Sequence, residues 1–288
     1  MNKLKNTFFN IFKSFKYGFQ KHKSRIIGYG FLCYSFLWTI IESATSILNK
    51  KVEGVEYYFS LVLISLLFGI HKIYQPRKIS FKIPTSDTTV KIFYGDIFEQ
   101  DGMIAIPVNE FFDSEIGKPV SELSLHGIMI KKILRGYSAS FDQAIKTDLS
   151  TEKYEEVQEK IEGKKKKYQI GTTIPMAVNN NVFLLFASSC TNPSDCKAYA
   201  DTTTVTKALK GLFSKARSEL GGKIINIPLV ASGLSGIGLP ATQLLQLIIL
   251  VLIEETKKQE ISKEIQIVLH ESRFEEIDLE LIKNQWSN

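Results

Sequence analysis

Three closely spaced glycines, Gly233, Gly236 and Gly238, follow an apolar strand-like run late in the chain and precede Leu-Pro and a long helical pattern. Glycines let the backbone approach a phosphate closely, and successive N–H groups, helped by the N-terminus of the following helix, form an anion-binding concavity. The Lys-Ser/Thr pair of a P-loop is missing, and the position near the last strand differs from that of the dinucleotide fingerprint. A flexible connection without a ligand is the alternative. The expected phosphate loop comprises Ser232, Gly233, Leu234, Ser235, Gly236, Ile237 and Gly238.

Two polar side chains follow earlier strand-like runs. Asp96 stands within Gly-Asp-Ile after the run TTVKIFY, and Asn109 ends the run GMIAIPVN. Open α/β sheets bind ligands at the carboxyl ends of their strands, where a carboxylate can accept a hydrogen bond from the exocyclic amine of adenine. Asn109 offers a donor and an acceptor to a pair of sugar hydroxyls. The alternatives are an aspartate in an ordinary turn and an asparagine that caps a helix.

The elements that must position these residues alternate from about residue 80 onwards. Strand-like runs such as KIINIPLV and EIQIVLH are separated by helical patterns, which predicts one α/β domain with helices on both faces of its sheet. The apolar run LLQLIILVLI is too short to span a membrane and predicts a helix buried against the sheet. Residues 146–168 are rich in charge and predict a solvated helix or a mobile excursion, with KKKK as solvated surface.

In their order, the three segments resemble a macro domain, the fold that binds ADP-ribose and its relatives. The resemblance covers roughly residues 88–275 and implies a three-layer α/β/α fold with a mixed central sheet. By this resemblance Asp96 and Ile97 contact adenine, Asn109 lies near the distal ribose, and the segment 232–240 cradles the diphosphate.

One departure from the macro-domain pattern concerns catalysis. Hydrolytic macro domains follow the asparagine with a glycine-rich loop, whereas this chain continues with EFFDSEIGK and then Ser-Leu-His-Gly. Asp113, Glu115 and His126 are candidate acids or bases, but nothing in the sequence positions them as a pair. We therefore expect binding without turnover, and a membrane-tethered ADP-ribosyl hydrolase or a non-catalytic scaffold that binds only protein are the alternatives.

Two apolar segments, residues 26–48 and 57–70, precede this domain. The first spans about 34 Å as a helix, enough to cross a hydrocarbon core of ~30 Å, and the second is a shorter span. A short polar loop joins them, so we expect a transmembrane helical hairpin. A soluble hairpin or a single span with a re-entrant segment are the alternatives. Glu42 in the first segment either lines a pore in an oligomer or lies near the outer interface.

Charge predicts the orientation of the hairpin and its surroundings. The net charge of +6 divides into +9 for residues 1–78 and −3 for the rest. Positive residues precede the first segment and follow the second. Because such residues favour the cytoplasmic side of a membrane, we expect both termini in the cytoplasm. We also expect anionic lipid as the partner of this basic region instead of nucleic acid. Phenylalanines and lysines within residues 1–25 predict an amphipathic helix on the lipid surface, with packing against the cytoplasmic domain as the alternative.

No metal site or disulfide is expected. The three cysteines, Cys33, Cys190 and Cys196, and the four histidines lack zinc-ligand spacing, and free thiols suit a reducing cytoplasm. No resident cofactor is predicted.

A membrane hairpin fused to a divergent macro domain is similar to the transmembrane–macro effectors of type II Thoeris, a bacterial antiphage defence system. That resemblance implies a multi-pass protein of the bacterial inner membrane. It further implies that a TIR-domain protein makes the signal, a histidine conjugate of ADP-ribose, and that capture of the signal causes homo-oligomerisation and membrane disruption. The expected domains are an amphipathic helix (1–25), two transmembrane helices (26–74), a linker (75–87) and the macro-like domain (88–288).

Overall fold

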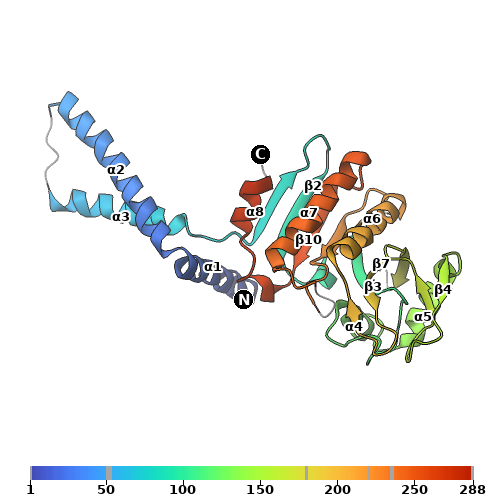
Figure 1. Cartoon of the computed structure of the whole chain (residues 1–288). Coiled ribbons are helices and arrows are strands. Elements are labelled where there is room, and N and C mark those ends of the chain that lie inside the picture. The colour runs from blue at the N-terminus through green and yellow to red at the C-terminus, as the bar shows by residue number, and fades with distance from the viewer. Residues whose placement is uncertain (1, 50–53, 179–180, 220, 234–236, 287–288) are drawn as a thin grey trace. The chain divides into compact units, whose positions relative to one another are not determined.

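The structure of the chain is a computed structural model that describes residues 2–49, 54–178, 181–219, 221–233 and 237–286, with residues 2–8 described by their backbone alone. The chain divides into two compact units, Met1–Arg77 and Lys78–Asn288. The first unit contains helices α1 (Asn2–Lys21), α2 (Lys23–Ile47) and α3 (Val55–His71) (Figure 1).

Helix α2 is long and apolar enough to cross a membrane by length and composition, and its apolar window is not buried inside the protein. Helix α3 is also apolar, but its 17 residues make it shorter than α2. Exposed side chains such as Phe31, Phe36, Phe59 and Leu66 surround both helices. An apolar surface on all sides of a helix is typical of a lipid-facing element.

Small residues bring α2 and α3 into close contact. A Cβ atom on Gly69 would lie 2.6 Å from the carbonyl oxygen of Ile26, and one on Gly30 would lie 3.4 Å from that of Ser65. Ser65 and Gly69 are four positions apart, so one face of α3 carries the small side chains that let the two backbones approach.

Towards the loop end of the hairpin the contact becomes aromatic. Trp38 of α2 stacks on Tyr58 of α3 with ring centroids 5.7 Å apart. Glu42, one turn further along α2, therefore lies at or beyond the level at which α3 begins at Val55. The carboxylate of Glu42 is thus at the loop end of the hairpin and not within its middle.

Helix α1 is held to the chain that follows α3. Its Gly18 lies against Ile73, where an added Cβ atom would overlap the carbonyl oxygen, and the rings of Phe15 and Tyr74 are 5.1 Å apart. Phe12 and Phe19 on the same helix are exposed.

The second unit is built on a mixed sheet. Its strands run in the order β1-β2-β10-β9-β3-β7-β6, and β8 pairs with β7. The five central strands, β2, β10, β9, β3 and β7, are parallel to one another, while β1 and β6 are antiparallel edge strands. The sheet strands are β1 (Lys78–Lys82), β2 (Thr89–Tyr94), β3 (Met103–Asn109), β6 (Thr173–Val178), β7 (Asn181–Thr191), β8 (Ala198–Tyr199), β9 (Ile225–Pro228) and β10 (Glu264–Leu269).

Helices cover both faces of this sheet, as the macro-like prediction requires. The helical elements are η1 (Ile97–Glu99), α4 (Leu125–Lys132), α5 (Ser138–Ser150), α6 (Thr202–Glu219), α7 (Ala241–Lys258), η2 (Glu271–Arg273) and α8 (Leu279–Trp286). On one face, Met129 of α4 and Phe141 of α5 pack with Ile104 and Ile106 of β3. The other face carries α6 and α7, which lie side by side (Figure 1). Leu245 and Ile248 of α7 are fully buried, so the predicted buried helix is confirmed.

Two expectations about connecting segments need correction. The range 75–87, expected as a linker, contains β1, in which the buried Ile79 and Phe81 alternate with exposed Lys78, Ser80 and Lys82. The range 146–168 is largely exposed, as expected, but it is neither one helix nor an irregular excursion. It contains the end of α5 and a hairpin of β4 (Tyr154–Glu156) and β5 (Lys166–Tyr168), and its Lys160 is fully buried. The burial depends on an ion pair with a residue far away in the sequence, described below.

Candidate functional site

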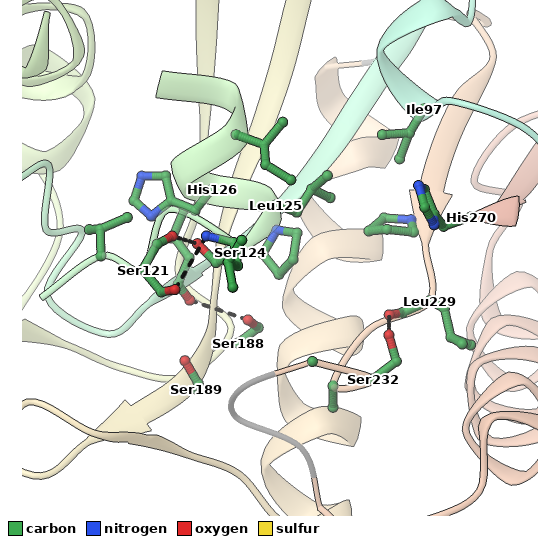
Figure 2. Close-up of a pocket in the computed structure, with 18 of the residues that line it drawn as sticks. Ile97, Ser121, Ser124, Leu125, His126, Ser188, Ser189, Leu229, Ser232 and His270 are labelled. Atoms are coloured by element: carbon green, nitrogen blue, oxygen red, sulfur yellow. Dashed lines mark hydrogen bonds between the residues drawn. The ribbon is translucent and has the colours of Figure 1, made fainter. Parts of the chain in front are cut away.

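A cavity of about 500 Å³ lies at the carboxyl edge of the sheet. All five parallel strands end at this edge, and each contributes residues to the cavity wall. The loop after β9 and the beginning of α4 complete it (Figure 2). The strand-end residues are Gly95 and Asp96, Val268 and His270, Pro228 and Leu229, Val108 and Asn109, and Ser188 and Ser189. A concave site of this volume, formed at strand ends, suits a small-molecule ligand.

Asp96 and Ile97, which the sequence predicts to contact adenine, both line the cavity. The Asp96 carboxylate accepts the N–H of Phe98 at 3.0 Å and the Lys132 ammonium at 3.1 Å. Partial burial acts to raise the pKa of Asp96, but these two bonds and the lysine charge outweigh it and hold the pKa below its usual value. The carboxylate is therefore ionised, and a ligand donor would share or replace its lysine partner.

Asn109, the predicted ribose contact, also lines the cavity, but its side-chain atoms are engaged elsewhere. The amide nitrogen donates to Asp113 at 2.9 Å and to the carbonyl oxygen of Pro119 at 3.3 Å. The amide oxygen accepts the backbone N–H groups of Phe111 and Asp113, both at 3.2 Å. An amide has two donors and room for two acceptors, so Asn109 is saturated by the loop that follows it.

A buried ion pair holds the same loop from the other side. Lys160 donates to both carboxylate oxygens of Asp113, at 3.0 and 2.9 Å, and both side chains are fully buried. Lys160 also donates to the carbonyl oxygen of Glu162, and its ammonium lies 4.4 Å from the ring centroid of Phe111. Asp113 further accepts the backbone N–H of Lys164 at 2.7 Å. This network fixes the segment between β3 and α4, which forms one wall of the cavity.

The predicted phosphate loop is described in part. Ser232 and Gly233 line the cavity, whereas Leu234, Ser235 and Gly236 lie outside the described residues. Ile237 and Gly238 are described but are not among the lining residues, and Gly238 has a positive φ of 73° that suits glycine. Ala231 has a φ of 59°, a strained value for a residue with a Cβ atom, at the point where the loop leaves β9.

The start of α4 supplies further wall residues, among them His126, which the sequence suggested as a candidate acid or base. The Ser124 hydroxyl accepts the N–H of Gly127 at 3.0 Å and so caps the helix. His126 lines the cavity but is almost wholly buried beside Phe141, and its Nε2 has no partner among the described residues. Burial, helped by the charge of Lys164, lowers the pKa of His126 to about 3, so its imidazole is neutral.

The basic residues of the wall are each paired with an acid. Lys118 contacts Glu162 at 2.9 Å, and Lys132 contacts Asp96 at 3.1 Å. The Arg273 guanidinium contacts Glu276 at 2.8 Å. Neither periodicity nor a motif in the sequence points to Lys118, Lys132 or Arg273. An anion in the cavity would thus depend on backbone N–H groups as much as on free positive charge.

Histidine, cysteine and carboxylate side chains do not gather into a metal-binding group anywhere in the described ranges.

Comparisons with known proteins agree with this architecture. Residues 90–270 match the family model described as Thoeris protein ThsA, Macro domain. An Oceanobacillus iheyensis macrodomain with ADP is 13% identical, with a TM-score of 0.50 over 72% of this chain and 96% of that chain. A variant of that macrodomain with ADPR gives a TM-score of 0.51 at 13% identity, covering 72% and 98% of the two chains. At this identity the likeness shows the fold. No curated protein sequence matches significantly.

Proposed function

This chain belongs to the Thoeris ThsA macro-domain family, and from that premise we propose that it is a membrane-anchored effector whose cytoplasmic macro domain binds an ADP-ribose-derived signal. The observation that carries the proposal is the cavity itself. Predicted base, ribose and phosphate segments, distant in sequence, meet there at the ends of β2, β3 and β9.

We assign the three parts of the ligand to three parts of the wall. Asp96 and Ile97 receive the adenine, with the exocyclic amine donating to the carboxylate. The loop 232–238 receives the diphosphate. The distal ribose lies on the side of Asn109, which acts mainly by holding the loop that forms this wall, because its own amide is saturated.

Several contacts favour binding over hydrolysis. Among the described wall residues the only carboxylate is that of Asp96, and it is paired with Lys132. Asp113 does not line the cavity and is neutralised by Lys160. A histidine with a pKa of about 3 is a weak base at neutral pH, which argues against His126 as a general base. A tethered ADP-ribosyl hydrolase is therefore the less favoured alternative.

We further propose that α2 and α3 form a two-span hairpin in the bacterial inner membrane, with both termini in the cytoplasm and α1 on the lipid surface. Exposed apolar residues around both helices support this, as do exposed Phe12 and Phe19 on α1. The 17 residues of α3 span about 25 Å, close to the hydrocarbon thickness. Because Glu42 lies at the loop end, the interfacial position is favoured over a pore-lining one.

The signal proposed is the histidine conjugate of ADP-ribose made by a TIR-domain partner, and its binding would lead to homo-oligomerisation and membrane disruption. A ligand drives such a change only by binding one arrangement better than another, by ~5.5 kcal/mol for a nearly complete switch. A scaffold that binds only protein is the remaining alternative and predicts no nucleotide affinity.

The test is calorimetric titration of the full chain in lipid nanodiscs with ADP-ribose and its histidine conjugate, with chromatography of the ligand afterwards. We expect the conjugate to bind more tightly and to be recovered intact. Release of free ADP-ribose would favour the hydrolase, and absence of binding to either ligand would favour the scaffold. Gly233→Glu, which places an anion in the phosphate loop, should abolish binding, whereas Ala139→Glu on the exposed first turn of α5 should not.

A further inference from the structure

Arg273 connects two strand ends at the cavity, and nothing in the sequence motifs points to it. It is the last residue of η2, directly after β10, and it lines the cavity. Its Nη2 donates to the main-chain oxygen of Ser232 at 2.6 Å. Its Nη1 contacts both carboxylate oxygens of Glu276, at 2.9 and 2.8 Å. The guanidinium is thus held in place by an acid and in turn holds the loop after β9.

The bond to Ser232 has a consequence for the next peptide group. The described peptide bonds are trans, so the carbonyl of Ser232 and the N–H of Gly233 point in opposite directions. With the carbonyl turned towards Arg273, the N–H of Gly233 points away from the guanidinium.

The surroundings of Gly233 leave room for a ligand at that N–H. Gly233 lines the cavity, and a Cβ atom added to it would meet nothing within 4 Å. The preceding residues are fixed, because the Ser232 hydroxyl donates to the carbonyl oxygen of Leu229 at 2.8 Å and Ala231 holds a φ of 59°. A strained backbone persists only where contacts with the surrounding structure hold it in place. The hydrogen bond from Arg273 to Ser232 is one such contact.

We propose that Arg273 is a positioning residue for anion recognition: by holding the carbonyl of Ser232, it directs the N–H of Gly233 at a phosphate group of the bound ligand. The proposal rests on the proposed function, since it assumes that a phosphate-bearing nucleotide occupies the cavity. It differs from a direct charge contact, because the guanidinium is already neutralised by Glu276 and acts through the peptide group that it orients.

The matched control is Arg217, which makes the same kind of contacts away from the cavity. Its guanidinium donates to the carbonyl oxygen of Glu255 at 2.6 Å and to the Glu255 carboxylate at 3.1 Å, and it does not line the cavity. Replacing Arg273 by methionine removes one carbonyl contact and an ion pair, whereas Arg217→Met removes two carbonyl contacts, to Glu255 and Gln259, and an ion pair, so the control should lose at least as much stability.

The experiment compares ADP with adenosine on the full chain in nanodiscs. Calorimetry gives the Kd for ADP, and saturation-transfer NMR gives the Kd for adenosine, which lacks phosphate. For Arg273→Met we expect the Kd for ADP to rise about tenfold, which corresponds to ~1.4 kcal/mol, with the Kd for adenosine unchanged. Glu276→Gln should show a smaller rise of the same kind. Arg217→Met should lower the melting temperature and leave both Kd values unchanged.

The outcomes separate the two claims. If the wild-type chain binds neither ADP nor ADP-ribose, the proposed function fails. If the wild-type chain binds ADP and Arg273→Met either leaves its Kd unchanged or weakens adenosine equally, the positioning role is overturned while the proposed function stands.

Discussion

Two lysine–aspartate pairs, Lys160 with Asp113 and Lys132 with Asp96, differ in how deeply they are buried. Lys160 contacts Asp113 at 2.9 Å with both side chains 0% exposed, whereas Lys132 contacts Asp96 at 3.1 Å with side chains 56% and 37% exposed. The distances are nearly equal, but the energetic roles are not. A buried charge that loses its partner is costly, while an exposed pair contributes little and exchanges readily with water or a ligand.

We call the wall held by Asn109, Asp113 and Lys160 the fixed wall. We call the wall that contains Asp96 and Lys132 the exchangeable wall, because a ligand can replace the contact between these two side chains. The wall between β3 and α4 is held by Asn109, Asp113 and Lys160, whose polar atoms bond to one another and to nearby main-chain groups. At the end of β2, the Asp96 carboxylate faces the cavity with a partner that is half exposed. The residues available for recognition are therefore those held least tightly by the protein.

The largest effect is expected from Lys160→Met. This change leaves the Asp113 carboxylate buried without a counter-charge, which should lower the free energy of unfolding by ~3–5 kcal/mol. Chemical denaturation of the full chain in detergent measures it. Adding Asp113→Asn, which removes the charge but keeps an acceptor for the N–H of Lys164, should restore much of the loss. If the free energy of unfolding of Lys160→Met alone falls by less than ~1 kcal/mol, the buried pair contributes no more than an exposed pair, and the proposed difference between the two pairs is contradicted.

An intermediate effect concerns pH at the fixed wall. His126 has a usual pKa of 6.5 that burial lowers to about 3 in the folded chain, so below pH 6.5 the unfolded chain binds a proton that the folded chain does not. Stability should therefore fall as the pH decreases, by ~2 kcal/mol at pH 5 from this group. In His126→Leu this part of the pH dependence should disappear. Equal pH dependence in both chains would contradict the assignment.

Asp96 at the exchangeable wall should respond to pH in a lower range. Its pKa is depressed in the folded chain, so its contribution to stability is present above the usual aspartate range and is lost only as the pH falls through the depressed value. The contributions of His126 and Asp96 to stability thus change over different pH ranges.

The smallest effect is expected from Lys132→Met. Because this pair is exposed, the free energy of unfolding should change by less than ~1 kcal/mol. Denaturation under the conditions used for Lys160→Met provides the direct comparison, and Lys131→Met on the same helix, which removes another exposed pair with Glu122, is the control. If Lys132→Met lowers the free energy of unfolding as much as Lys160→Met does, exposure does not determine how much these ion pairs contribute to stability.

The fold was predictable from the sequence because its signals are local. Strand-like runs, the buried helix α7 and the Gly-Asp, Val-Asn and glycine-rich segments each depend on neighbouring residues, and the described parts of these three segments lie at the ends of β2, β3 and β9. The strand β1 was missed because two buried side chains among lysines give a weak pattern.

The fixed wall was not predictable, because it depends on contacts between distant segments. Lys160 lies in a charge-rich stretch that is typical of solvated surface, and its partner Asp113 is 47 positions away. In the same way, Arg273 reaches Ser232 across 41 positions. No periodicity or spacing records such pairs. The residue types of the site were thus visible in the sequence, while the contacts that leave some of them saturated and others open were not.

The contact between Gly18 and Ile73 has a mechanical consequence. Since only a hydrogen atom fits between the backbone of α1 and the carbonyl of Ile73, α1 cannot move closer to the segment that follows α3 without displacing it. Gly18→Ala, whose methyl group would overlap this carbonyl, should push the two segments apart.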